Sequence, residues 1–303
     1  MKLGIVVVYM VKPENAELLD LHLNKIRTLT TVPYTIYAGV NRPPPSLLER
    51  LKVEAGLEIV PLPETDLSSS AEHSFYLEHL IERALNGDVT HVVTLHVDSF
   101  PIRHDWAEVI AAQLKGNTAL ATLSKNRFLI GYSACLFFRR DFWEECRPRL
   151  LLTAADRSSQ EYERFARDYR YHDEESGAGY LFRAYASGKE FMLLERSNAG
   201  EDVGQFGSVH GDLVFHLEGA YRYDKLSEEE RATANKARRK ALIVAKNRLK
   251  RCVPKAVRRR ARGLSLPLIN SWERPLYDEA RRALLDDPEG YLERLRAGAG
   301  RAG

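Results

Sequence analysis

The sequence has little cysteine and no long apolar run. Its three cysteines, Cys135, Cys146 and Cys252, are odd in number and do not have the spacing of a metal site. Neither a disulfide framework nor a cysteine-ligated zinc ion is therefore expected. No apolar run approaches the roughly 20 residues that a membrane-spanning helix needs. These absences predict a soluble cytoplasmic protein whose thiols are reduced.

A signal peptide is also not expected at the start of the chain. The first apolar run, LGIVVVYM (3–10), is about eight residues long, and no small-residue cleavage site follows it. Because this run is rich in valine and isoleucine, it is typical of a strand that is covered on both faces.

Acidic residues are missing from one long stretch near the C-terminus. Residues 231–262 contain 14 lysines and arginines and no aspartate or glutamate, so the rest of the chain carries 31 basic against 42 acidic side chains. A basic segment of this kind can dock on the acidic body or on a partner subunit, or can lie on an anionic membrane surface. Nucleic-acid binding is not expected, because the segment has no aromatic residue and no recognised module accompanies it.

What the sequence does contain is a regular alternation of strands and helices. Runs typical of strands occupy 3–10, 34–41, 57–63 and 90–97, and helical periodicity separates them at 14–29, 46–56 and 70–87. This alternation predicts an α/β fold with a mostly parallel central sheet and helices on both faces.

The second half of the chain is less regular. Strands are expected at 117–127, 132–140, 191–198 and 208–219, and a helix is expected at 175–190. We expect residues 1–225 to form the α/β domain and residues 226–303 to form a basic helical C-terminal extension.

Polar residues stand at the carboxyl ends of the predicted strands, where sheets of this class bind their ligands. Asn41 ends the second strand, and His96 and Asp98 end the fourth, which Ser99-Phe100-Pro101 is expected to break. Because His96 lies one strand period before Asp98, both side chains are expected to point to the same side.

These residues suggest a divalent cation. An ion that also binds a diphosphate needs only one or two protein carboxylates, with histidine as a further ligand and open positions for phosphate oxygens. Asp98 and His216, which lies near the end of the predicted strand 208–219, have the right chemistry for that pair. Besides His96 with Asp98, and His216, a third site with acidic residues and a histidine is the run His172-Asp173-Glu174-Glu175.

Three segments together resemble the GT-A glycosyltransferases, and the inverting glycosyltransferase family 2 in particular. They are LHVDSFP (95–101), HDEESGAGYLFRAYASGKEFMLL (172–194) and GDLVFHLEG (211–219). The first resembles the segment that carries the family's Asp-x-Asp motif, with His96 in place of the first aspartate. The second resembles the segment that supplies the catalytic base, and the third resembles the strand whose histidine completes the metal site. The resemblance covers roughly residues 3–220.

The resemblance implies a GT-A fold, which is Rossmann-like, and the transfer of a sugar with inversion. The donor would be a UDP-, GDP- or dTDP-sugar, and the acceptor would be a hydroxyl of a glycan or a lipid-linked molecule, in surface polysaccharide or glycolipid assembly. Peripheral membrane contact would come from 231–262.

The site residues follow from the same resemblance. Mn²⁺ or Mg²⁺ on Asp98 and His216 would offset the charge of the leaving diphosphate. Glu175 is the first choice for the base, Asp173 the second and Glu174 the third, since an acid at a helix N-terminus stays ionised. The residues implied in nucleotide-sugar binding are Val8, Tyr9, Asn41, His73, His96 and Asp98.

Three other functions remain open at this point. A nucleotidyltransferase usually has a glycine-rich phosphate loop after its first strand, but VVYMVKPEN (7–15) contains no glycine. A non-catalytic nucleotide- or carbohydrate-binding protein on a decayed transferase fold is favoured by His96 in place of the first aspartate. A scaffold that binds membranes or partners through its basic segment is a third alternative.

Overall fold

The computed structural model describes residues 1–10, 16–41, 44–124, 133–169, 171, 176–198, 206–218 and 274–299. The chain divides into two compact units. The first consists of Met1–Gly200, Ser208–His216 and Leu295–Gly303, and the second of Glu201–Gly207 and Leu217–Arg294. Both sheets described below belong to the first unit. The expected domain boundary at residue 225 lies outside the described residues and stays a prediction.

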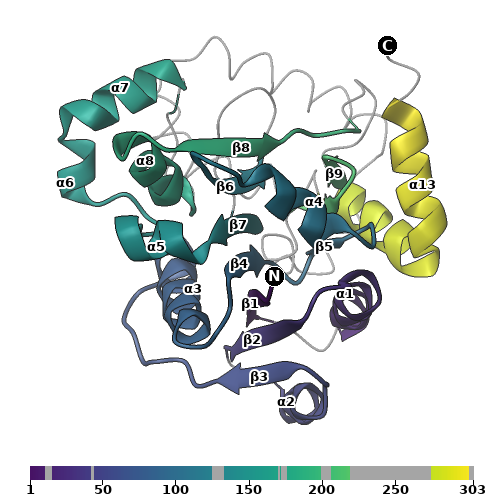
Figure 1. Ribbon diagram of the computed structural model, residues 1–303. Helices are drawn as coiled ribbons and strands as arrows, with labels where there is room; N and C mark the ends of the chain where they lie inside the picture. The colour runs from purple at the N-terminus through teal and green to yellow at the C-terminus, as the bar shows by residue number, and fades with distance from the viewer. Residues whose placement is uncertain are drawn as a thin grey trace. The chain divides into compact units, whose positions relative to one another are not determined.

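A seven-stranded sheet forms the centre of the first unit (Figure 1), in the order β3-β2-β1-β4-β7-β6-β8. Of these strands, only β7 runs antiparallel to its neighbours. The predicted α/β fold with a mostly parallel sheet is therefore confirmed. The strands are β1 (Leu3–Tyr9), β2 (Tyr34–Val40), β3 (Leu57–Val60), β4 (His91–Leu95), β6 (Thr118–Leu123), β7 (Cys135–Arg139) and β8 (Glu190–Leu194).

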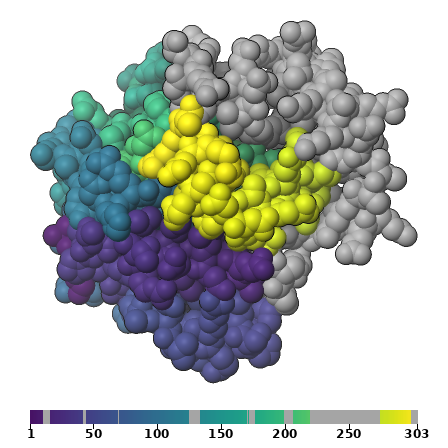
Figure 2. Space-filling view, turned by 90° about the vertical axis from the view of Figure 1, so that its right-hand side faces the viewer, coloured from purple at the N-terminus to yellow at the C-terminus, as the bar shows by residue number. Residues whose placement is uncertain are grey.

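Helices cover both faces of this sheet, because β1 is apolar on both of its sides. Ile5, Val7 and Tyr9 pack in one core with α1 (Ala16–Leu29), α2 (Pro45–Lys52) and α4 (Trp106–Gln113). These three helices lie side by side on the face that Figure 2 shows, with α1 in purple between the other two. Val6 and Val8 pack in the other core, with α3 (Ser69–Leu85), α5 (Arg140–Cys146), α7 (Gln160–Asp168) and α8 (Ala178–Ala186).

A smaller sheet, which the sequence did not predict, lies beside the end of β4. It has the order β5-β10-β9 and consists of β5 (Ser99–Pro101), β10 (Val214–His216) and β9 (Ser208–His210). The expectation that 99–101 only breaks a strand was wrong, because Pro101 ends an edge strand, where a missing N–H is tolerated.

The expected single strand at 208–219 was also wrong. Residues 208–216 form a hairpin whose turn places Gly211 and Asp212 at φ 57° and 55°. The N–H of Leu213 donates to the carbonyl of His210 at 3.0 Å and closes this turn.

The C-terminal part is helical where it is described. Residues 274–286 and α13 (Pro288–Ala299) are helices, which confirms the predicted helical extension for these residues. The basic segment 231–262 lies outside the described residues. Among the described helices, none is both long and apolar enough to cross a membrane. The remaining short helix is α6 (Ala154–Arg157).

Candidate active site

The candidate site lies at the edge of the central sheet where β1, β2 and β4 end. These strands are parallel neighbours, so the residues that follow them lie at the same edge. Asn41 follows β2, and His96 and Asp98 follow β4, as the sequence predicted.

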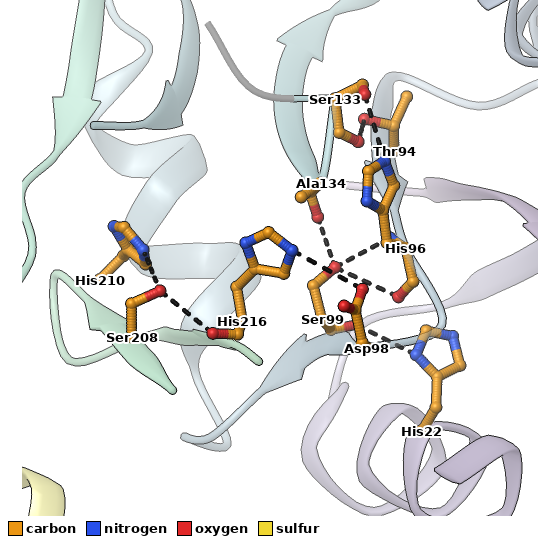
Figure 3. A network of polar contacts seen from close by, with 10 residues as sticks. All are labelled: His22, Thr94, His96, Asp98, Ser99, Ser133, Ala134, Ser208, His210 and His216. Atoms are coloured by element: carbon orange, nitrogen blue, oxygen red, sulfur yellow. Dashed lines mark hydrogen bonds and ion pairs between the residues drawn. The ribbon is translucent and has the colours of Figure 1, made fainter. Parts of the chain in front are cut away.

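Three side chains meet at this edge (Figure 3). One possible ligand atom from each of His96, Asp98 and His216 lies within 4.8 Å of the others. The Nε2 atom of His216 is 3.6 Å from Oδ1 of Asp98. Asp98 and His216 are only 4% and 5% exposed, whereas His96 keeps part of its surface accessible. The predicted pair of Asp98 and His216 is thus brought together, and His96 joins it.

The small sheet is what brings His216 to Asp98. In the antiparallel pairing of β10 with β5, His216 is the partner of Ser99, the residue that follows Asp98. Phe215 pairs with Phe100 in the same register, and their rings lie 5.1 Å apart. Residues more than 110 positions apart in sequence are therefore held together by one strand pair.

His96 and Asp98 lie together for a different reason from the one expected. The strand β4 ends at Leu95, and residues 96–99 form a turn in which the N–H of Ser99 donates to the carbonyl of His96 at 2.9 Å. The turn, rather than the alternation of a continuing strand, places the two side chains near each other.

Ser99 holds this turn through both its side chain and its carbonyl. Its hydroxyl accepts from the N–H of His96 at 2.8 Å and donates to the carbonyl of Ala134. Its carbonyl accepts a hydrogen bond from Nδ1 of His22, on α1, at 3.0 Å. The turn is thus tied to the residue before β7 and to a helix on the sheet's face.

His96 lies among other imidazoles. Its ring is 5.0 Å from that of His73 and 5.9 Å from that of His216, and both pairs are edge to face. Its Nε2 is 3.1 Å from the hydroxyl of Ser133. Burial, and secondly the neighbouring histidines, hold the pKa of His96 well below its ordinary value. The ring is therefore neutral near pH 7, which is the form that binds metal ions.

His73 and Asn41 lie on the side of the site next to α3. Burial lowers the pKa of His73 to about 4, against the opposing effect of Glu72. The side-chain amide of Asn41 donates to Glu72 at 3.3 Å, and the hydroxyl of Tyr76 donates to the same carboxylate oxygen at 3.2 Å. Contact of His73 or Asn41 with a nucleotide stays a prediction.

Val8 and Tyr9, the last residues of β1, are buried in the two cores on opposite faces of the sheet. The Tyr9 ring packs edge to face against His22 at 5.7 Å, and burial raises the pKa of its hydroxyl. A role for either residue beneath a nucleotide stays a prediction.

The acidic run that contains Asp173, Glu174 and Glu175 lies outside the described residues. Ser176, which follows it in the chain, is described. Its carbonyl accepts from the N–H of Ser133 at 3.1 Å, and its hydroxyl is 2.8 Å from that of Ser74 at the start of α3. Since Ser133 also contacts His96, the residue after the run is two hydrogen-bonded steps from the cluster.

Sequence reasoning missed three residues that position the site: His22, Ser99 and Ser133. His22 shares the apolar face of a predicted helix, where a histidine is usually a core residue. The sequence assigns Ser99 only to the break of a strand. The two serines carry no pattern that distinguishes them from other serines.

The cluster fits a divalent cation. Two atoms bound to one ion at about 2.1 Å, with an angle of about 90 to 115° between them, lie about 3.0 to 3.5 Å apart. The separation of 3.6 Å between His216 and Asp98 is close to that range. His96 is only partly buried.

Comparisons with known proteins give structural matches only. No protein-family model matches the chain, and no curated protein matches it significantly. Among solved structures, matches to GT-A glycosyltransferases cover up to 64% of the chain.

Three of these structures illustrate the likeness. The mannosyltransferase PcManGT from Pyrobaculum calidifontis, in complex with GDP-Man and Mn²⁺, is 15% identical with a TM-score of 0.36, over 47% of this chain and 46% of that one. Residues 1–349 of S. aureus TarS, in complex with UDP-GlcNAc, are 11% identical with a TM-score of 0.39, over 64% and 56%. Mouse xyloside xylosyltransferase 1 is 8% identical with a TM-score of 0.43, over 64% and 85%.

The match thus spans about half the length of the PcManGT chain and of the TarS fragment 1–349. Nothing about its function follows from likeness at this level.

Proposed function

We propose that this protein is a glycosyltransferase that moves a sugar from a nucleotide-diphosphate sugar to an acceptor hydroxyl. One observation carries the proposal: His96, Asp98 and His216 gather within 4.8 Å at the carboxyl-end edge of a mostly parallel sheet. This is the edge at which sheets of this class bind nucleotides, and the group is of the kind that holds a cation against a diphosphate.

The role of the cluster follows from the charge of the leaving group. A Mn²⁺ or Mg²⁺ ion held by Asp98 and His216 would supply positive charge to the departing nucleoside diphosphate. Asp98 contributes the negative charge that holds the ion, and its low exposure keeps water from competing for its oxygens. The pairing of β5 with β10 fixes the spacing of the two side chains.

The acceptor hydroxyl needs a base, since a neutral hydroxyl is a weak nucleophile. We assign this role to Glu175, with Asp173 as the second choice and Glu174 as the third. The hydrogen bonds that Ser176 makes to Ser133 and Ser74 support the assignment, because they anchor the residue after Glu175 close to the cluster. A single displacement in which this carboxylate takes the proton inverts the anomeric centre.

The acceptor class and the setting are part of the same proposal. We assign a glycan or a lipid-linked molecule as acceptor, in surface polysaccharide or glycolipid assembly. The basic segment 231–262 supports a lipid-linked acceptor, because its charge suits an anionic membrane surface.

A non-catalytic nucleotide-binding protein is the second candidate. The observation that favours it is His96, which leaves Asp98 as the one carboxylate of the cluster among the described residues. The two candidates differ in whether a nucleotide-sugar is broken down after it binds.

Calorimetry tests the nucleotide site. We expect UDP, GDP or dTDP to bind the full chain at least about ten times more tightly with Mn²⁺ than without it, because an ion held by the cluster would offset the charge of the diphosphate. Asp98→Asn is expected to remove this dependence on Mn²⁺. Failure of all three nucleotides to bind, with or without the ion, contradicts the proposal.

The Glu175→Gln variant separates an enzyme from a binding protein. Nucleotide affinity is expected to stay unchanged. Hydrolysis of the nucleotide-sugar, in which water takes the place of the acceptor hydroxyl and receives the sugar, is expected to fall about 10² to 10⁴ fold, the usual contribution of a general base. Glu174→Gln is the matched control, with the same change one residue away. Equal rates for both variants and the unmodified protein show that Glu175 is not the base, and Asp173→Asn is then measured. No turnover by the unmodified protein favours the non-catalytic alternative.

A further inference from the structure

We infer that His96 is a third protein ligand of the cation at Asp98 and His216, and that this site therefore selects a first-row transition metal over Mg²⁺. The resemblance seen in the sequence instead implies a place for His96 in nucleotide binding. The role of the ion toward a diphosphate rests on the proposed function. Metal binding itself is measured without a nucleotide.

The three side chains lie close enough together to share one ion. Each of the three residues offers one ligand atom, and these atoms all lie within 4.8 Å of one another. Two ligand atoms on opposite sides of one ion are about 4.2 Å apart, so this limit is slightly wider than the spacing around a bound ion. The pair of His216 and Asp98, at 3.6 Å, is too long for a good hydrogen bond but close to the distance between adjacent ligands. Small side-chain movements would bring all three within reach of one ion.

The His96 ring turns one nitrogen to Ser133 and the other to the cluster. Its Nε2 lies 3.1 Å from the hydroxyl of Ser133. In Figure 3 the other ring nitrogen, Nδ1, is turned away from Ser133 and toward Asp98 and His216. If Nε2 carries the proton and donates to Ser133, the lone pair of Nδ1 faces the cluster. A ligating histidine generally makes such a bond through its other nitrogen.

Hydrogen bonds fix both Ser133 and His96 in place. The carbonyl of Ser133 accepts from Thr94 at 2.6 Å, and its N–H donates to Ser176. The N–H of His96 donates to Ser99 at 2.8 Å. A preorganised ring loses little freedom when it binds an ion, which favours binding.

The selectivity follows from the donor atoms. Mg²⁺ takes oxygen ligands and keeps several of its waters, whereas imidazole nitrogen suits later first-row ions. Two imidazoles and one carboxylate therefore favour ions such as Co²⁺ and Zn²⁺ over Mg²⁺, with Mn²⁺ between them. Three protein ligands leave open positions for diphosphate oxygens.

The test uses the full chain and Co²⁺ alone. We expect Co²⁺ to bind with visible d–d absorption, and at least about 100 times more tightly than Mg²⁺ in competition. His96→Ala is expected to weaken Co²⁺ binding about 10 to 100 fold or more. His96→Asp is expected to lower the preference for Co²⁺ over Mg²⁺, because it replaces nitrogen by oxygen. His104→Ala, at an exposed histidine outside the cluster, is the control and is expected to have no effect.

X-ray absorption on the unmodified protein with Zn²⁺ keeps the inference testable if the variants do not fold. Two coordinated imidazoles are expected, and a single one overturns the inference. Equal affinity for Co²⁺ and Mg²⁺, or no binding of either ion, also overturns it. If Mg²⁺-dependent nucleotide binding persists with one imidazole bound, the proposed function stands and this inference fails. If two imidazoles bind Zn²⁺ but no nucleotide binds, this inference stands and the proposed function fails.

Discussion

At the scale of single residues, His22 links the helix layer to the candidate site. It is fully buried on α1, and its Nδ1–H donates to the carbonyl of Ser99. Burial lowers its pKa to about 3, an effect only partly opposed by that hydrogen bond. The folded protein therefore holds a neutral imidazole at this position across the physiological pH range.

This burial predicts loss of stability in mild acid. In the unfolded chain His22 titrates near 6.5, so below that pH the unfolded state binds a proton that the folded state does not bind until about pH 3. Between about pH 7.5 and about pH 5, His22 is expected to account for a loss of about 2 kcal/mol in the free energy of unfolding. Urea unfolding at a series of pH values measures the loss.

The matched variant is His22→Asn, whose amide N–H can still donate to Ser99 but does not titrate. Between about pH 7.5 and about pH 5, the unfolding free energy of this variant is expected to fall by about 2 kcal/mol less than that of the unmodified protein. Some dependence on pH remains, because burial also lowers the pKa values of His73, His91 and His96. Parallel curves for the variant and the unmodified protein contradict the assignment.

At the scale of helices and strands, the sequence predicted the parallel core but not the small sheet. The core strands were predictable because continuous apolar runs and helical periodicity are local patterns. The strand β5 has three residues and ends in Pro101, so it carries no periodic signal. The hairpin 208–216 did carry a signal, since Gly-Asp between two apolar segments is typical of a tight turn.

The site shows the same division between local and distant information. Asp98 and His216 are recognisable in the sequence because each ends a predicted strand. That they lie 3.6 Å apart depends on the pairing of β5 with β10, which no local pattern encodes. The contribution of His22 and Ser133 depends on packing between layers, which a single sequence does not reveal.

The hairpin turn gives a prediction at this scale. Gly211→Ala places a side chain at φ 57°, which costs about 1 to 2 kcal/mol, although the nearest atom to the new Cβ is at an ordinary contact distance of 3.4 Å. The turn holds β9 and β10 in register, so the substitution is expected to shift His216. If a cost of about 1 to 2 kcal/mol falls largely on the metal site, the affinity for Co²⁺ is expected to fall about 3 to 10 fold. Calorimetry measures the affinity, and thermal unfolding measures the stability.

Gly188→Ala is the matched control for the hairpin. Gly188 has φ 65°, and a Cβ added there would meet no atom within 4 Å. Its substitution is expected to cost similar stability and to leave metal affinity unchanged, because it lies before β8, outside the small sheet. Equal effects of the two variants on metal affinity show that the turn has no specific part in placing His216.

At the scale of the whole molecule, the charge is strongly segregated along the sequence. The total charge is +3, yet residues 231–262 carry 14 positive charges and no acidic residue. The remaining residues have an excess of acidic side chains. A segment of this kind is attracted to anionic lipid by about 1 kcal/mol for each lysine or arginine near the surface. The attraction would bring the protein to the surface where lipid-linked acceptors lie.

The last prediction tests this membrane role in the full chain. Replacing Lys236, Arg238, Arg239 and Lys240 together by glutamine is expected to weaken binding to phosphatidylglycerol vesicles about 10² to 10³ fold, because four charges near the surface are lost. The control replaces four exposed basic residues elsewhere, Lys52, Lys115, Arg164 and Arg167, and keeps the same net charge change. If the membrane contact is specific to the segment, the control loses much less affinity, and raising the salt concentration weakens the unmodified protein's binding. Equal losses for both variants attribute the attraction to net charge alone. Unchanged binding of the first variant contradicts membrane contact by the segment and leaves docking, on the acidic residues or on a partner subunit, as its role.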